Sequence, residues 1–273
     1  MPTRKQALNP SRPVKDDGFA PQVGNPDFVL SLARGLRVIE SFAGYKDGRS
    51  IAEVSQSTGL SRASIRRILL TLELLGYVER SRQVFRLKAQ ILRLGFSFLS
   101  ASSVVEAAQP VLERVTESLH ESSSMSMLDD GEIVYVARSA ASRVLAAGLS
   151  VGSRLPAYCT SMGRVLLASL SDADLDAYFC TLKPKAYTSK TIVKIAALKK
   201  AVLDARQRGY AIVNEELEVG LRSVAVPVFS RSHRVVAAIN IGTHVSRADH
   251  HTLVKTFLPV LKEGARILRE ILP

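Results

Sequence analysis

Apolar residues recur every three or four positions through the first part of the chain, which is the spacing of amphipathic helices. Three such runs predict helices at residues 28–42, 51–58 and 62–75. Ser50 and Ser61 precede the second and third runs and can cap a helix N-terminus, while Gly76 ends the third. Two short runs at residues 77–80 and 84–87 then predict a β-hairpin.

The third predicted helix has one apolar and one basic face. Its apolar stripe consists of Ile65, Ile68, Leu69, Leu72 and Leu75. Ala63, Arg67 and Leu70 lie opposite the stripe, and Arg66 flanks it. Three helices followed by a hairpin are the order of a winged helix-turn-helix, so we expect residues 27–88 to form one.

The pattern changes after a further apolar run at residues 89–101, which predicts a linker helix. A helix over residues 104–119 should break or kink at Pro110. Beyond it, strands are predicted at residues 125–128, 132–138, 210–213, 221–229 and 235–243, and helices at residues 164–168 and 194–208. Ser246 and Asp249 resemble a capping box for a last helix that bends at Pro259. Residues 102–273 therefore predict an α+β domain.

The distribution of prolines, apolar stretches and cysteines indicates what class of protein this is. Residues 1–26 hold five of the eleven prolines, which predicts a flexible tail. The apolar stretches are too short to span a membrane and no signal peptide is expected, so the sequence indicates a soluble, cytoplasmic protein. The two cysteines, Cys159 and Cys180, are too few for a disulfide framework or a zinc cage.

Charge points to a polyanionic partner. The formal net charge is +12, with a sequence pI of about 10.0. Residues 61–93 contain eight basic residues and two acidic ones, and arginines can bind guanine edges or phosphates of double-stranded DNA. The alternative is a solvated basic surface. The candidate DNA contacts are Ser61, Arg62, Ser64, Arg66, Arg67, Arg80, Arg82 and Arg86.

Motifs for enzymatic chemistry are missing from the sequence. It has no phosphate-binding loop, dinucleotide fingerprint or H-E-x-x-H, and its five histidines lack metal-ligand spacing, so no cofactor or metal is expected. Cys159 precedes a predicted helix N-terminus that would lower its pKa. This leaves a small-molecule hydrolase or transferase using Cys159 as an alternative. A nucleophile also needs an oriented base, and the sequence identifies none, which favours a buried or pocket-lining thiol and no enzyme.

Three C-terminal motifs resemble a known family. LPAYCTSMGRVLLA (155–168), GYAIVNEELEVGLRSVAVPV (209–228) and AAINIGTHVSR (237–247) are similar to those of IclR-type transcriptional regulators, and the likeness extends over residues 27–272. DFVLSLARGLRVIESF (27–42) and LSVGSRLPAYCTSMGR (149–164) resemble more closely the Pca/Pob-type branch, which controls the β-ketoadipate route of aromatic catabolism.

The resemblance implies a winged helix-turn-helix, a linker helix and a GAF-like α/β effector-binding domain. It also implies a homodimer or tetramer on a palindromic operator, and an effector such as protocatechuate, 4-hydroxybenzoate or β-ketoadipate. RNA polymerase is a further candidate partner, whereas activation or repression depends on operator position. Leu70, Leu74, Phe96 and Leu99 are apolar residues available for assembly, unless they pack within their own chain.

The effector site is expected between the loop at residues 156–164 and the strands that carry Ser223 and Asn240. At the pocket positions that the resemblance assigns, Asn240 can bind a phenol hydroxyl and Gly242 leaves room for a ring, so a hydroxylated aromatic carboxylate bound without covalent chemistry is favoured. Free N–H groups at a helix start near Arg164 would favour the carboxylate. Arg138 and Arg154 are alternative counter-charges. The candidate effector residues are Arg138, Arg154, Tyr158, Cys159, Thr160, Ser161, Met162, Ser223 and Asn240. A sensor for a protein partner remains an alternative.

Overall fold

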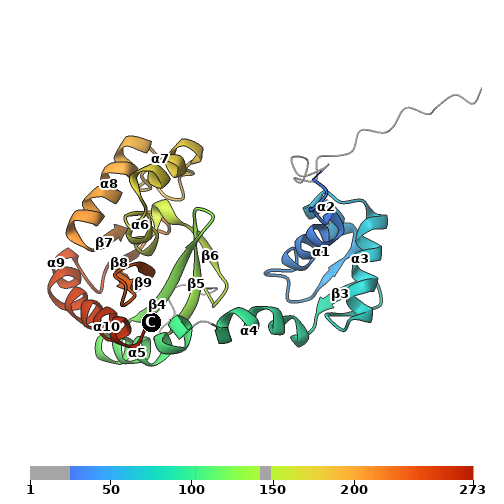
Figure 1. Ribbon diagram of the computed structural model, residues 1–273, viewed down its shortest axis with the longest axis horizontal. Helices are drawn as coiled ribbons and strands as arrows, with labels where there is room; N and C mark the ends of the chain where they lie inside the picture. Colours follow the sequence, from blue (N-terminus) through green and yellow to red (C-terminus); the bar gives the residue numbers. More distant parts are fainter. Residues whose placement is uncertain (1–24, 102, 142–148, 273) are drawn as a thin grey trace, which may run out of the picture. The chain divides into compact units, whose positions relative to one another are not determined.

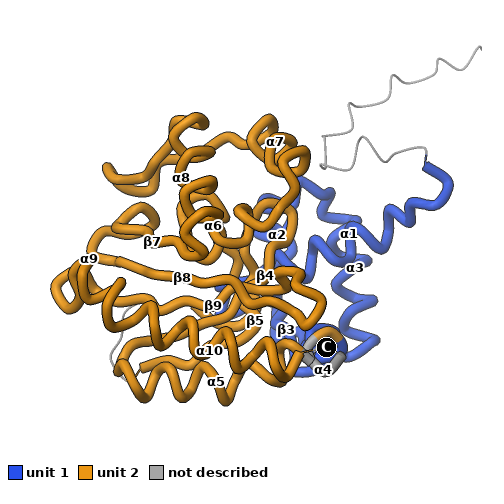
Figure 2. Tube along the Cα trace, turned by 60° about the vertical axis from the view of Figure 1, so that its left-hand side comes forward, with its two compact units in different colours: residues 1–97 blue, residues 98–273 orange. Residues whose placement is uncertain are grey.

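The computed structural model describes residues 25–101, 103–141 and 149–272, so almost all of the expected flexible tail lies outside the described residues. The chain forms two compact units, residues 1–97 and 98–273 (Figure 2). The division between them falls within α4 (Leu92–Ala101), the expected linker helix, which follows a short 3₁₀ turn, η2 (Ala89–Ile91). Every helix in the described part of the chain is too short or too polar to cross a bilayer.

The N-terminal unit is a winged helix-turn-helix, as the sequence predicts. Its helices are α1 (Leu30–Glu40), α2 (Ile51–Thr58) and α3 (Arg62–Leu74), and its sheet has the order β1 (Arg49–Ser50), β3 (Val84–Leu87), β2 (Val78–Ser81). Local signals set these boundaries. Ser50 and Glu53 form a capping box, Gly59 ends α2 in the left-handed conformation, and the Ser61 hydroxyl accepts a bond from the Ser64 N–H.

Helix α3 buries most of its predicted stripe. Ile65, Leu69 and Leu72 are in the core of the N-terminal unit, and Ile68 packs against it. Leu75 does not follow, because α3 ends at Leu74 and the side chain of Leu75 is 57% exposed. The apolar face of α3 is therefore one residue shorter than its periodicity suggests.

The C-terminal unit is built on one antiparallel six-stranded sheet (Figure 1). In spatial order its strands are β6 (Arg154–Pro156), β5 (Glu132–Ser139), β4 (Ser122–Asp129), β9 (Val235–His244), β8 (Leu221–Phe229) and β7 (Ala211–Asn214). Strand β6 was not predicted, because three residues are too few to show an alternating pattern.

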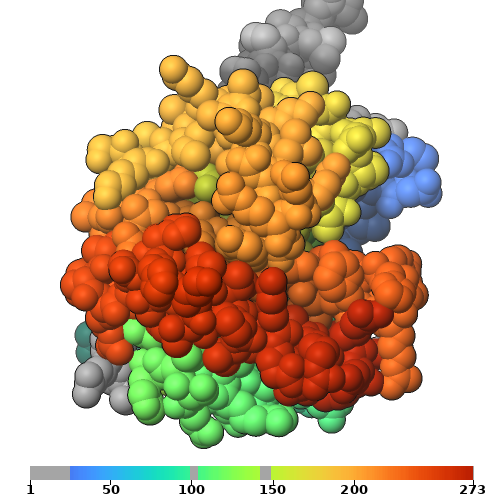
Figure 3. Space-filling view, turned by 90° about the vertical axis from the view of Figure 1, so that its left-hand side faces the viewer, coloured from blue at the N-terminus to red at the C-terminus, as the bar shows by residue number. Residues whose placement is uncertain are grey.

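Helices cover both faces of this sheet. On one face pack α5 (Ser103–Leu119) and α10 (Leu258–Ile271), which lie side by side although far apart in the sequence (Figure 3). The other face holds η3 (Ala157–Cys159) and α6 (Ser161–Leu167), with α7 (Asp172–Thr181) and α8 (Ile195–Arg208) outside them (Figure 1). Helix α7 was not predicted from the sequence.

The helix break predicted at Pro110 and the helix cap predicted at Ser246 are both absent from the structure, while a kink at Pro110 stays a prediction. Helix α5 runs through Pro110 without a break, because Ala108, Val111 and Leu112 are buried against the sheet and packing offsets the lost hydrogen bond. The last helical segment is capped by Asp249, whose carboxylate accepts the Thr252 N–H, and not by Ser246.

The expected bend at Pro259 stays a prediction, and the helix is irregular directly before this proline. A short helix, α9 (His250–Thr252), passes into a π-helical turn, η4 (Leu253–Phe257), and Pro259 lies in the first turn of α10, where its missing N–H leaves no bond unmade. The irregularity therefore precedes the proline.

Candidate functional site

The two faces of the six-stranded sheet carry side chains of different size. Toward α5 and α10 point large apolar residues such as Met125, Val224, Ile239 and Ile241. Toward α6 the same central strands carry small or polar residues, namely Ser122, Ser124, Ser223, Ala225, Ala238, Asn240 and Gly242. Because these short side chains cannot fill the space beneath α6, a pocket remains there.

The empty space at the pocket is about 640 Å³ with the open solvent at its mouth included, and the cavity itself accounts for about 50 Å³ of it. Strands β4, β5, β7, β8 and β9 form its floor, and the turn from η3 into α6 lies across it. Its lining residues are Ser122, Ser124, Tyr135, Arg138, Leu149, Cys159, Thr160, Ser161, Met162, Val213, Leu217, Leu221, Ser223, Asn240 and Gly242.

A β-bulge brings Arg138 into this pocket. Ser126 is opposite Tyr135 and Met125 is opposite Ala137, so Val136 is an extra residue on β5. Beyond the bulge the alternation of side chains is reversed. Tyr135 and Arg138, three residues apart, therefore both line the pocket, and Arg138 supplies its positive charge.

Two buried polar atoms in the pocket have no hydrogen-bond partner among the described residues: Ser161 Oγ and Asn240 Oδ1. Arg138 Nη1 donates to Ser124 Oγ over 3.3 Å, which leaves the rest of the guanidinium available. Buried polar atoms are normally hydrogen-bonded, and unpaired ones cost about 1–3 kcal/mol each. A ligand with a hydroxyl and a negative group would satisfy both atoms and pair with Arg138.

Helix α6 begins at Ser161, not near Arg164 as expected. Thr160 is its N-cap residue, and its hydroxyl accepts the Gly163 N–H over 3.2 Å. The extra turn carries Ser161 and Met162 onto the pocket wall, where Met162 also accepts a bond from the Ser126 hydroxyl. Thr160 lines the pocket while its hydroxyl is used within the turn.

Two expected effector residues lie elsewhere. Arg154 is outside the pocket lining, because its guanidinium pairs with Asp129 over 2.6 Å and with Glu132 over 2.7 Å at the sheet edge. Tyr158 points away, and its hydroxyl donates to Lys185 O and accepts from Lys185 N. Tyr135, Ser122 and Ser124 also line the pocket and were not predicted, although the alternation of serines along β4 is visible in the sequence.

Cys159 is a buried pocket residue and not an activated nucleophile. Desolvation, assisted by the nearby Glu216 carboxylate, raises the pKa of its thiol to about 12. The expected lowering by a helix N-terminus is therefore wrong, because burial outweighs it.

The two thiols should differ in reactivity. At pH 8 Cys159 is below its raised pKa and stays protonated, so iodoacetamide is expected to alkylate exposed Cys180 and leave Cys159 unmodified until the protein unfolds. Peptide mass spectrometry before and after addition of denaturant measures this. Alkylation of Cys159 at a rate similar to Cys180 in the folded protein would contradict the burial described.

In the N-terminal unit, the basic residues of α3 and of the β2–β3 hairpin are exposed. Arg62, Arg66 and Arg67 form no ion pair with any described carboxylate. Arg80 and Arg86 are also exposed, and the Nε atoms donate to backbone oxygens of Arg82 and Asp47, respectively. Buried Arg49 bridges Ser41 O and Glu53 O and thereby joins α1 to α2.

No group of three or more histidine, cysteine or acidic side chains that could hold a metal ion is found in the described ranges. Among the described residues, the polar groups of the pocket are the Arg138 guanidinium, several hydroxyls, the Asn240 amide and the Cys159 thiol. These groups bind and orient a ligand through hydrogen bonds.

Comparisons with known proteins agree with this geometry. The family "Bacterial transcriptional regulator IclR C-terminal" matches residues 96–269, and the "IclR helix-turn-helix domain" matches residues 31–82. The Pca regulon regulatory protein of Pseudomonas putida is 44% identical, over 90% of this chain and 84% of that protein.

Solved structures show the same likeness. A transcriptional regulator from Rhodococcus sp. RHA1 is 45% identical with a TM-score of 0.80, covering 90% of this chain and 98% of that one. The inducer-binding domain of a double mutant of PobR from Acinetobacter, solved with 3-hydroxybenzoic acid, is 32% identical with a TM-score of 0.57, covering 60% and 96%. The predicted likeness to Pca/Pob-type regulators, rather than to enzymes, is thus confirmed. The chain belongs to the IclR family of bacterial transcriptional regulators.

Proposed function

We propose that this regulator binds a hydroxylated aromatic carboxylate in the pocket beneath α6 and controls genes of aromatic-acid catabolism. The observation that carries the proposal is that Arg138 lines the same pocket as two buried atoms without a hydrogen-bond partner among the described residues, Ser161 Oγ and Asn240 Oδ1. Arg138 pairs with the carboxylate, and the ring hydroxyl donates to Asn240 Oδ1. Gly242 leaves space for the ring.

The named relatives support this class of ligand. The Pca regulon regulatory protein is a regulator of a Pca regulon, and the PobR domain was solved with a hydroxybenzoic acid. Protocatechuate, 4-hydroxybenzoate and β-ketoadipate are the effectors we place first. As a regulator of bacterial transcription the protein acts in the cytoplasm, at an operator near RNA polymerase.

Calorimetric titration with protocatechuate, 4-hydroxybenzoate, β-ketoadipate and pyruvate tests the ligand class. An aromatic hydroxy acid is expected to bind most tightly. Ser161→Ala and Asn240→Ala each remove a pocket hydrogen bond and should raise Kd by roughly 3- to 30-fold. Ligand-free DNA affinity should stay unchanged in both variants. Binding of a sugar or an amine, together with no heat from any carboxylate, would refute the proposal.

We also propose that α3 enters the major groove and that the β2–β3 hairpin contacts phosphates. Arg66→Ala or Arg67→Ala should cost about 1–3 kcal/mol of operator affinity and relax specificity at one base pair. Arg82→Ala should weaken binding to all sequences and reduce the salt slope. Exposed Lys200 on α8 provides a matched control whose substitution leaves affinity unchanged. Fluorescence anisotropy at several salt concentrations measures these effects. If Arg66→Ala and Arg67→Ala both kept the operator affinity of the parent, α3 would not be the helix that enters the major groove.

Two-fold DNA sites require an assembly, and we propose a homodimer or tetramer on a palindromic operator. Leu74 is 89% exposed, so it is available to a second copy, and the side chain of Phe96 is 66% exposed. Leu70 is partly buried, and the side chain of Leu99 lies outside those that the structure describes. Sedimentation at micromolar concentration without DNA should show a dimer or larger species, and a monomer would contradict this assembly.

A further inference from the structure

The C-terminal unit contains a buried ion pair outside the pocket lining. Arg164 Nη2 lies 2.7 Å from Glu216 Oε2, and the two side chains are 5% and 7% exposed. Each of the other ion pairs between described residues has at least one partner more than a third exposed. The apolar pattern of α6 does not predict a buried charge at Arg164, and neither Arg164 nor Glu216 lines the pocket.

The pair connects two walls of the pocket. Arg164 is on α6, one turn after Ser161, and its Nε donates to Tyr158 O over 3.0 Å, in the turn that also carries Cys159. Glu216 immediately precedes Leu217, which lines the pocket from the connection between β7 and β8. A displacement of either charge would therefore change the distance between Ser161 and Leu217.

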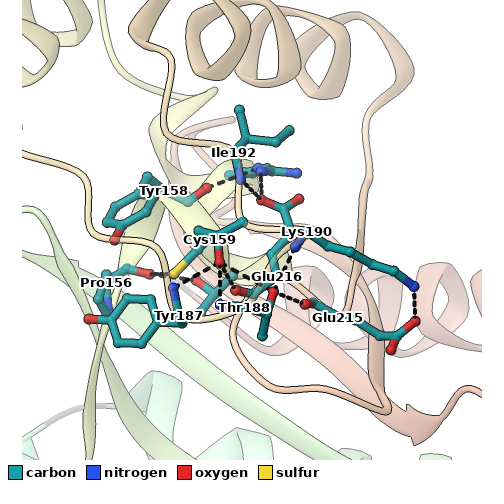
Figure 4. A network of polar contacts seen from close by, with 12 residues as sticks. Pro156, Tyr158, Cys159, Tyr187, Thr188, Lys190, Ile192, Glu215 and Glu216 are labelled. Atoms are coloured by element: carbon teal, nitrogen blue, oxygen red, sulfur yellow. Dashed lines mark hydrogen bonds and ion pairs between the residues drawn. The ribbon is translucent and has the colours of Figure 1, made fainter.

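The Glu216 carboxylate also fixes a third segment, the connection between α7 and α8 (Figure 4). Its Oε2 accepts the Ile192 N–H over 3.1 Å, and the Thr191 hydroxyl donates to Glu216 O over 2.5 Å. Beside it Glu215 pairs with Lys190 and accepts the Gly220 N–H. One side chain thus holds the connection before β8 against two other parts of the chain.

Stability alone does not explain such a pair. Removing two charges from water is costly, and well-packed apolar residues of similar size often replace a buried pair without loss of stability. An ion pair fixes the distance and direction between two segments, whereas apolar residues do not. We infer that Arg164 and Glu216 are positioning residues for the effector pocket, which hold Ser161 and Leu217 in the geometry that the ligand needs. This inference rests on the proposed function of the pocket.

The double variant Arg164→Met/Glu216→Leu separates positioning from folding. It should fold, with a thermal midpoint lowered because the Ile192 N–H and Tyr158 O lose their partners, and below that midpoint it should bind 4-hydroxybenzoate at least about tenfold more weakly in calorimetry. Hydrogen exchange without ligand should become faster at residues 159–163 and 215–221. Glu216→Gln keeps an oxygen acceptor for Arg164 and the Ile192 N–H, so it should recover most of the affinity. If the double variant does not fold, Arg164→Lys replaces it, because this variant loses the hydrogen bond to Tyr158 O. It too should bind 4-hydroxybenzoate more weakly and exchange amide hydrogens faster at residues 159–163 and 215–221.

Arg206→Met is the matched control. Arg206 Nε donates to Ala168 O and its Nη2 to Leu170 O, so it also ties α8 to the end of α6, yet it does not line the pocket. This variant should lose stability and keep its ligand affinity. The inference is overturned if a folded variant of Arg164 or Glu216 has the same ligand affinity and the same hydrogen-exchange rates as the parent. If the parent protein binds none of the carboxylates, the proposed function is wrong. Faster hydrogen exchange at residues 215–221 of the double variant would then still support a positioning role for the ion pair. Unchanged hydrogen exchange in that variant would refute the positioning role.

Discussion

Gly163→Ala is expected to unfold the C-terminal unit or to destabilise it by at least about 3 kcal/mol. A Cβ at Gly163 would lie 2.1 Å from Ala157 O and 2.3 Å from Ala157 Cα. These neighbours are backbone atoms of η3, so α6 and the turn before it would have to separate. Thermal unfolding followed by circular dichroism measures the loss.

Gly242→Ala is the control for this substitution. At Gly242 an added Cβ meets only Leu221 Cδ1 at 3.8 Å, an ordinary van der Waals contact. The variant should fold as the parent does, while its methyl group reduces the space in the pocket. Equal thermal midpoints for Gly163→Ala and the parent would show that α6 does not pack against η3 as described.

Arg138→Gln is expected to cost about 3 kcal/mol of effector affinity, which is roughly a 100-fold rise in Kd. The substitution removes the one positive charge that the described residues bring to the pocket lining, while retaining a polar side chain on β5. Calorimetry with 4-hydroxybenzoate measures the loss, and an uncharged analogue such as 4-hydroxybenzamide should bind both proteins about equally.

Arg154→Gln is the matched control, because Arg154 also belongs to the sheet but is held by Asp129 and Glu132 outside the pocket. Its ligand affinity should equal that of the parent. If Arg154→Gln lost the affinity and Arg138→Gln kept it, the carboxylate would have been assigned to the wrong arginine.

The sequence predicted the DNA-binding unit well because its signals are local. Ser50, Gly59 and Ser61 each act on residues within one helical turn, and the apolar period of α3 follows from its own side chains. The long strands β8 and β9 were predicted for a similar reason, since their alternating residues face two different layers.

The pocket was only partly predictable, because its geometry depends on contacts between distant residues. The bulge at Val136 decides that Arg138 faces the pocket, and no residue type in β5 signals it. Arg154 is occupied by carboxylates 22 and 25 positions away along the sequence. Arg164 and Glu216 are 52 positions apart, so the pattern around either one gives no sign of the other.

A crystal structure of the protein with 4-hydroxybenzoate tests the central claim most directly. The ligand should lie beneath α6, with its carboxylate against Arg138 and its hydroxyl within hydrogen-bond distance of Asn240 Oδ1 or Ser161 Oγ. Ligand density at any other place, or an empty pocket at saturating ligand, would contradict the assignment of this pocket as the effector site.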